Sequence, residues 1–438
     1  MRTTSRTGAP SPPRADFNRT LHLLMNGHVK GLYDRLGLAR MAISLRHRNY
    51  RLFFIGQSIS NVGSWMQKIA ISWLVYRMTD SVFMLGFATF VGQLPSFVIS
   101  PFAGVLADRC NRRTLMLVLQ TSQLLVAATL AAIVCLGVAQ VWQLLLLNCL
   151  IGILNACDLP VRQSFTAEMI GEGEASVLSN AIALNSTMMN LAKLIGPVLA
   201  GTLITIAGEG VCFIFNAVSF LAVLASLCMM RVPRRKLPPR GGAILGELLG
   251  GLRYARHHSH IRRTLVLLSV FAFLGQPHIS LLPVFAKEVL GGGPDTLGVL
   301  MACQGLGAVC GAMYLAGRAS TEGIERCVAL ACMLYSACLF AFTCSQNQAL
   351  SMALLVVTGF AMMVQMAGSN TILQTHTGAD MRGRIMSFYA VAVMGMTPLG
   401  SLIAGGVADR IGVADTVAIG AGLCLLAGLG SWRLIKSE

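Results

Sequence analysis

Two lysines lie inside long apolar runs of this sequence, where a charged side chain is unusual. Lys193 falls near the middle of its run, and Lys68 falls in the outer half of another. A charge deep in a bilayer is unfavourable by several kcal/mol and marks a functional site by default. An ammonium group donates hydrogen bonds and attracts anions, so the expected chemistry is binding of a negatively charged or strongly polar molecule. For Lys68, snorkelling of the ammonium to the interface is the alternative.

Polar side chains accompany both lysines at helical spacing. One stripe recurs at i, i+3 and i+7 and the other at i, i+4 and i+7, so each occupies one helix face. The stripes are Asn61, Ser64 and Lys68, and Ser186, Asn190 and Lys193, with Asn185 beside the second. We expect them to line a water-filled path. The alternative is that their amides and hydroxyls join membrane helices to one another.

The eighteen acidic side chains lie elsewhere. None falls near the middle of an apolar run, and the deepest, Asp158, is near the end of its run. His278, beside Pro277, is therefore the best candidate for proton exchange, because an imidazole titrates near neutral pH. A desolvated Lys193 is the second candidate. For His278 the alternative role is a hydrogen bond at the helix break that Pro277 imposes.

The elements that position these residues are membrane helices. Hydrophobic residues make up 55% of the chain and charged residues only 12%, with a mean hydropathy of +0.68. Backbone groups in lipid must bond to one another, so long apolar runs become helices. Each run of about 20 apolar residues can cross the bilayer. The twelve predicted runs are 50–76, 83–107, 114–137, 141–158, 176–207, 211–230, 263–287, 296–317, 326–343, 348–370, 382–407 and 413–434.

The net charge of +16 is a topology signal. If the twelve helices alternate in direction, nearly all Lys and Arg of the loops fall on one side. Positive loops face the cytoplasm, so both termini are predicted to be cytoplasmic. Anionic lipid is an expected partner of this basic surface. Nucleic acid is not, because the charge follows the loops of a membrane protein.

The chain divides into two sets of six predicted helices. Residues 46–230 form the first bundle, 263–438 the second, and 231–262 a cytoplasmic linker. Leucines at helical spacing in the linker favour a short amphipathic helix on the membrane surface. A plain polar linker is the alternative. Residues 1–45 are basic and poor in acids, which fits a flexible cytoplasmic tail, a transit peptide, or a true start near Met41.

Metal and nucleotide chemistry find no support in the sequence. The thirteen cysteines form no C-x-x-C pair and no Cys/His set at metal spacing. The basic and histidine-rich segment 256–263 is predicted to be solvated surface. We also find no P-loop, so no cofactor and no direct use of ATP are expected.

A short loop with charges of both signs follows the second apolar run. Its sequence, Gly104-Val-Leu-Ala-Asp108-Arg109-Cys110-Asn111-Arg112-Arg113, resembles the G-x-L-x-D-R-x-x-R-R signature of the major facilitator superfamily. The segments Asp158-Leu-Pro-Val-Arg162-Gln163 and Met381-Arg382-Gly383-Arg384 resemble the drug-efflux branch of the enterobactin-exporter type. The resemblance implies a twelve-helix fold of two pseudo-symmetric bundles that exports small molecules by proton antiport.

The resemblance also implies a gate at the loop. The superfamily places the residue equivalent to Asp108 against the start of the eleventh helix, near Arg382, where free backbone N–H groups attract an anion. We expect Arg112 to pair with Asp158 on the same side. These contacts, with Gly104, Arg109 and Arg113, would hold the cytoplasmic side shut. The alternative is that the loop only anchors the topology.

The predicted protein is thus a membrane exporter of small, siderophore-like or drug-like molecules, acting as a monomer with protons as the coupling ion. Lysines without a nearby carboxylate favour anionic or polar aromatic substrates over lipophilic cations. The alternatives are an importer of the same fold, or a membrane sensor or scaffold that does not transport. An enzyme is not expected, since no Ser/His/Asp set, metal cluster or acid pair lies at membrane depth.

Overall fold

The computed structural model describes residues 43–436, with gaps at 171–174, 231–252, 319 and 321. The predicted tail and the amphipathic segment of the linker therefore lie almost entirely outside the described residues. Within the described part every regular element is helical and no strand occurs. This confirms the predicted all-α fold class.

Six long helices precede the linker and six long helical segments follow it. The first six are α3 (Arg48–Thr79), α4 (Val82–Arg109), α5 (Arg112–Cys135), α6 (Val141–Ile170), α7 (Ala175–Ala207) and α8 (Glu209–Met229). The later ones are α10 (Ser259–Val270) continuing through α11 (His278–Val284), α12 (Pro294–Ala316), α13 (Ile324–Thr343), α14 (Gln348–Thr375), α15 (Ala379–Ala390) continuing into α16 (Met396–Ile411), and α17 (Val413–Lys436).

Eleven of these segments are long and apolar enough to cross a membrane. The remaining one is α3, which is 32 residues long and carries polar residues that include Gln57, Gln67 and Lys68. It packs against α7 and α8, two of the eleven. The predicted count of twelve is consistent with this arrangement.

Local sequence signals account for the helix ends. Asn111 caps α5 by accepting a hydrogen bond from the Thr114 backbone N–H at 3.1 Å. Asn347 caps α14 in the same way. Asparagine is among the best residues for this position, because its side-chain oxygen satisfies an otherwise unpaired N–H group.

Two of the long segments contain single turns of π-helix. They lie at Phe271–Gly275 and Phe285–Val289, on either side of α11, and at Val391–Gly395 before α16. Such turns often occur where a helix kinks or at functional sites. Pro277 and Pro283 lie beside the first two, so the seventh predicted span is broken rather than continuous.

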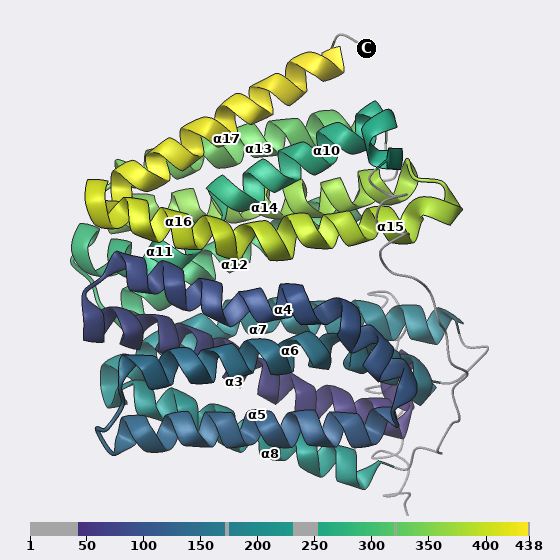
Figure 1. The fold of residues 1–438 in the computed structure, drawn as a ribbon, viewed down its shortest axis with the longest axis vertical. Coiled ribbons are helices and arrows are strands. Elements are labelled where there is room, and N and C mark those ends of the chain that lie inside the picture. Colours follow the sequence, from purple (N-terminus) through teal and green to yellow (C-terminus); the bar gives the residue numbers. More distant parts are fainter. Residues whose placement is uncertain (1–42, 171–174, 231–252, 319, 321, 437–438) are drawn as a thin grey trace, which may run out of the picture.

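The helices form two groups that meet along two seams. Helices α3–α8 pack mainly on one another, as do α10–α17, and we call these groups the N bundle and the C bundle. The seams are α4 against α16 and α7 against α12. Figure 1 shows the N bundle below the C bundle, with α4 and α16 lying side by side at their boundary.

Candidate functional site

One end of the two seams carries polar contacts that join the bundles. The Lys287 ammonium, at the end of the broken helix, donates to Asp80 Oδ1 at 2.6 Å. It also lies 5.0 Å from the centre of the Tyr76 ring. The Tyr76 hydroxyl donates to the Glu288 carboxylate. We call these four residues the clasp, and the end of the molecule where they lie the clasp end.

The backbone at Asp80 fits this role. Asp80 ends α3 with a φ of 45°, in the left-handed region, and its N–H donates to the Tyr76 carbonyl at 2.8 Å. Aspartate tolerates this conformation better than most residues with a side chain. The turn therefore aims the carboxylate of the N bundle toward the lysine of the C bundle.

Glycines bring the bundles into close contact toward the same end. A Cβ atom added at Gly86 of α4 would collide with the backbone carbonyl of Ser401 in α16. In the other seam, a Cβ atom at Gly201 of α7 would collide with the carbonyl of Pro294 at the start of α12. Small residues of this kind allow membrane helices to approach closely. Both seams are therefore tight toward the clasp end.

Basic residues gather at the opposite end, which we call the basic end. There Arg112 contacts Glu168 at 3.4 Å. Asp158, which is buried, accepts a hydrogen bond from Gln120 at 2.8 Å and lies 3.5 Å from Arg162 on its own helix. In this conformation Arg112 is placed on Glu168. The expected pairing with Asp158 is a contact of the shut cytoplasmic gate and stays a prediction. Asp158 already has an arginine one turn away on its own helix, whereas Arg112 reaches Glu168, nearly three turns further along α6.

The remaining residues of the predicted gate divide into two groups. Arg113 donates to the Leu227 carbonyl at 2.8 Å and so neutralises the negative end of α8. The surroundings of Gly104 and the side chains of Asp108 and Arg109 lie outside the described part of the structure. Their contact with the helix that begins near Arg382 stays a prediction.

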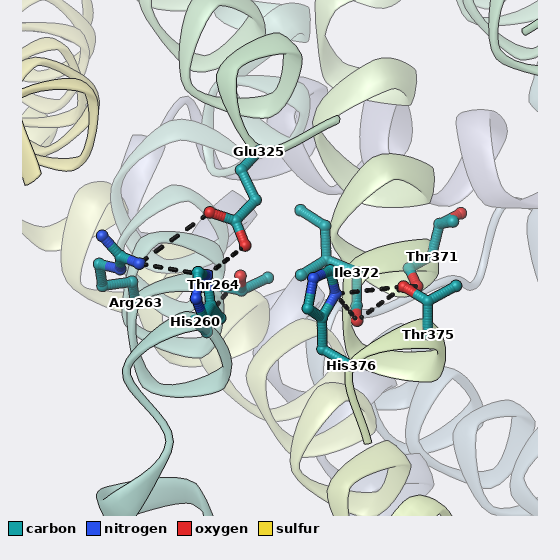
Figure 2. Close-up of polar contacts among 8 residues, drawn as sticks. All are labelled: His260, Arg263, Thr264, Glu325, Thr371, Ile372, Thr375 and His376. Atoms are coloured by element: carbon teal, nitrogen blue, oxygen red, sulfur yellow. Dashed lines mark hydrogen bonds and ion pairs between the residues drawn. The ribbon is translucent and has the colours of Figure 1, made fainter. Parts of the chain in front are cut away.

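A second charged cluster lies at the basic end of the C bundle. Figure 2 shows His260 and Arg263 of α10 directed toward Glu325, the second residue of α13. His260 Nδ1 lies 2.7 Å from Glu325, and its ring stacks on that of His376, the residue that follows α14, with 5.5 Å between the ring centres. The segment 256–263 was predicted to be solvated surface. Arg256, His257, His258 and Arg262 are exposed as predicted. The Arg263 side chain is the exception at 11% exposed, because it belongs to a cluster that joins three helices.

The two lysines predicted to bind substrate both lie close to one aromatic ring, that of Trp65. The Lys68 ammonium of α3 is 4.8 Å from the centre of the Trp65 ring, and the Lys193 ammonium of α7 is 5.8 Å from it. Both lysine side chains are exposed, and neither has an acidic partner among the described residues. We call these three residues the lysine–tryptophan cluster. Trp65 itself was missed, because an aromatic residue in an apolar run is typical of a core position.

The other predicted cavity residues have mixed roles. Asn185 accepts a hydrogen bond from Tyr50 at 3.1 Å and donates to Thr166, so it joins α7 to α3 and α6. Asn61 accepts from Arg162 at 3.4 Å. These two residues match the alternative of helix-to-helix contacts. Ser64 is exposed, and Asn190 is half-buried without a described hydrogen-bond partner, as a cavity lining requires.

His278 is enclosed by polar partners. Its Nδ1 atom lies 2.8 Å from the Gly275 carbonyl and 3.0 Å from the Tyr335 hydroxyl. Its Nε2 atom lies 2.9 Å from the side-chain amide of Gln304. The imidazole is 1% exposed and sits beside the π-helical turn. This geometry favours the helix-break role, because both ring nitrogens already have partners within the protein.

The fold of two bundles joined by the clasp, together with the family match, defines a membrane transporter of the major facilitator class, not an enzyme. It is a multi-pass membrane protein with a small-molecule substrate. Residues 40–436 match the family described as transmembrane secretion effector. The chain belongs to this family, as the sequence resemblance predicted.

The chain is similar to known transporters over most of their length. It is 23% identical to the staphyloferrin A transporter of Staphylococcus aureus, over 84% of this chain and 92% of that protein. It is 24% identical to the enterobactin exporter of Shigella boydii, over 89% and 92% of the two chains. It is 19% identical to macrolide efflux protein A of Streptococcus pyogenes, over 84% and 92%.

A solved structure supports the fold. A POT family transporter in complex with a thioalcohol-conjugated peptide superposes with a TM-score of 0.70 and 11% identity, over 89% of this chain and 96% of that chain. At this identity the likeness concerns the fold alone.

Proposed function

We propose that the protein exports small molecules across the inner membrane of a bacterium by alternating access of its two bundles. The direction and the substrate type are supported by its relatives, which are named as an enterobactin exporter, a staphyloferrin A transporter and a macrolide efflux protein. Siderophore-like or drug-like molecules are therefore the proposed substrates.

The observation that carries this proposal is the uneven packing of the seams. The clasp and the tightest glycine-to-backbone contacts between the bundles lie toward one end, and both polar links between the bundles that the structure describes belong to the clasp. The lysine–tryptophan cluster lies between that closed end and the basic end. A transporter closed at one face, with a polar site beyond the closure, is what one half of an alternating-access cycle requires.

The basic end is the cytoplasmic face in this proposal. Arg112, Arg162 and Arg263 lie there, and arginine and lysine are enriched in cytoplasmic loops. The clasp end then faces the periplasm, and the chain termini face the cytoplasm. Substrate would enter from the cytoplasm while the clasp holds the periplasmic face shut.

Proton exchange is the proposed energy source, and Lys193 and His278 are the two candidate proton carriers. A proton carrier must be reached by water from each face in turn. The Lys193 side chain is exposed at the protein surface in this state, whereas His278 is enclosed. Export into everted vesicles under an imposed pH gradient, with His278→Ala and Lys193→Ala, tests both. Unchanged coupling in both variants would remove them as carriers.

A deletion strain tests the function itself. Cells that lack the protein should retain metabolites and become sensitive to drugs, with and without iron limitation, and the intact gene should restore export. Asp108→Asn should insert in the membrane in normal amount but fail to restore export, since it removes the charge of the predicted gate. An unchanged metabolite and sensitivity profile after deletion would contradict export. Full restoration by Asp108→Asn would contradict the gate.

A further inference from the structure

We propose that the lysine–tryptophan cluster is the substrate site, and that it selects organic anions that carry a planar aromatic ring. The inference rests on the proposed function and names its substrate class. Lys68, Trp65 and Lys193 would act together, with the two ammonium groups holding the anionic group and the indole providing a stacking face.

The first support is that the two ammonium groups converge. They come from different helices, α3 and α7, yet both lie within 6 Å of the same indole centre, at 4.8 and 5.8 Å. A cation is attracted to the face of tryptophan at such distances, which stabilises the ammonium groups while no ligand is bound. The attraction of an indole is weaker than that of a carboxylate, so the site remains open to an anion.

The depth of the cluster is the second support. Lys68 is eleven residues from the end of α3, and Lys193 is fourteen from the end of α7. At 1.5 Å per residue they lie about 16 and 21 Å from the clasp end, and thus at a similar level inside the membrane. Neither lysine is close enough to a helix end for simple snorkelling to explain its position.

The charge balance is the third support. The described acidic side chains that are buried or half-buried are engaged elsewhere. Asp158 and Glu168 lie beside arginines at the basic end, Glu209 pairs with Arg77 near the clasp end, and Glu325 belongs to the cluster of Figure 2. Two positive charges at membrane depth thus have no internal counter-charge in the described part of the chain. An anionic ligand would supply one.

All three residues of the site belong to one bundle. Trp65 of α3 packs on Gly196 of α7, where an added Cβ atom would lie 2.6 Å from the Trp65 Cβ. This contact holds the two helices that carry the lysines close together at the level of Trp65. The helices therefore need not be brought together when a ligand binds, which lowers the loss of conformational freedom.

Anion binding has a consequence for energy coupling. The lysines must keep their protons to hold the anion, so a proton that leaves Lys193 would weaken binding in the cytoplasm, where a proton antiporter must bind substrate. In this assignment Lys193 therefore binds the substrate and does not carry the exchanged proton. Outward movement of one negative charge is favoured by about 2.3 kcal/mol per 100 mV of inside-negative potential, so that potential should stimulate export.

Direct binding to the purified full-length protein in lipid nanodiscs tests the site without requiring transport. The probes are 2-naphthoate, its neutral analogue 2-naphthamide, and the cation tetraphenylphosphonium. We expect 2-naphthoate to bind at least tenfold more tightly than the other two. Lys68→Gln and Lys193→Gln should each weaken 2-naphthoate binding about tenfold or more, because each removes a charge-assisted contact. Lys436→Gln, at the far end of α17, is the matched control and should leave affinity unchanged.

Two further measurements keep the outcome clear. Trp65→Phe preserves both charges and should weaken 2-naphthoate severalfold, which covers the case in which a lysine variant does not fold. Equal binding of 2-naphthoate and 2-naphthamide, or wild-type affinity in both lysine variants, would overturn the anion site. Drug or siderophore export that persists in those variants would leave the proposed function standing, whereas a deletion strain without any phenotype would remove the function and not the binding site.

Discussion

The close contact between α4 and α16 gives the sharpest prediction about conformational change. Gly86 faces the Ser401 backbone carbonyl across the seam, and no flexible side chain is there to yield. Gly86→Ala therefore forces the two helices apart only when the clasp end is closed. The gain in helix propensity from alanine applies to both conformations, so it cancels in the equilibrium between them.

Overpacking of this kind typically destabilises the packed state by about 1–3 kcal/mol. The population closed at the clasp end should thus fall by roughly 5-fold to 150-fold relative to the open one. Gly152→Ala is the matched control. Its Cβ atom meets the Gly92 carbonyl, which is an equally tight contact but one that lies within the N bundle. It should lower stability without shifting the equilibrium.

Spin labels at Val138 and Gln346 can report the shift. Both positions are exposed, and they lie at the clasp end on different bundles. Labels introduced as unnatural amino acids avoid the thirteen native cysteines. Double electron–electron resonance should show a longer distance in Gly86→Ala than in the wild type or in Gly152→Ala. The reasoning fails if the two glycine variants give the same distance distribution, or if Gly86→Ala remains entirely closed.

Three further outcomes follow from the polar contacts. Tyr76→Phe removes the buried hydroxyl that donates to Glu288. It should destabilise the conformation closed at the clasp end by about 1.5 kcal/mol, so that the ratio of open to closed molecules in the same distance measurement rises about tenfold. An unchanged ratio would show that this contact does not stabilise the closed conformation. His278→Ala should lower the thermal unfolding temperature by several degrees while pH-gradient coupling persists, and a loss of coupling at unchanged stability would contradict the helix-break role. Asp158→Asn leaves Arg162 without its carboxylate and should lower the free energy of unfolding of the N bundle by about 1–3 kcal/mol. Arg112→Gln should lower it by less. Unfolding of both variants in detergent measures the difference.

Most of the fold could be predicted because membrane helices depend on local properties. Length and hydropathy alone reveal the spans, since a backbone in lipid has few alternatives to the helix. The exception is informative, because α3 carries so many polar residues that it is not among the eleven apolar spans. The π-helical turn at Phe271–Gly275 could not be predicted, since it depends on how that helix packs against its neighbours.

Part of the site could also be found in the sequence. Lys68 and Lys193 are visible because a charge stands out in an apolar run. Their common partner Trp65 could not be found in this way, since the sequence alone does not distinguish it from a core residue. The Tyr76–Glu288 contact joins residues 212 positions apart, so only the folded chain reveals it.

The placement of Arg112 on Glu168 in this conformation has a physical reason as well. The sequence places Asp158 and Arg162 four residues apart on one helix, where an ion pair forms locally. That local partner, together with Gln120, satisfies the Asp158 carboxylate in this state. The choice between Asp158 and Glu168 for Arg112 depends on the depth at which α5 and α6 pack, which one sequence does not fix.

The most direct test of alternating access is to measure both ends of the protein in the same preparation. One label pair is at Val138 and Gln346 at the clasp end, and the other is at Arg46 and Glu322, which are exposed at the basic end on different bundles. When Gly86→Ala opens the clasp end, the account predicts that the basic-end distance shortens. Distances that lengthen together at both ends, or a basic end that does not respond, would contradict it.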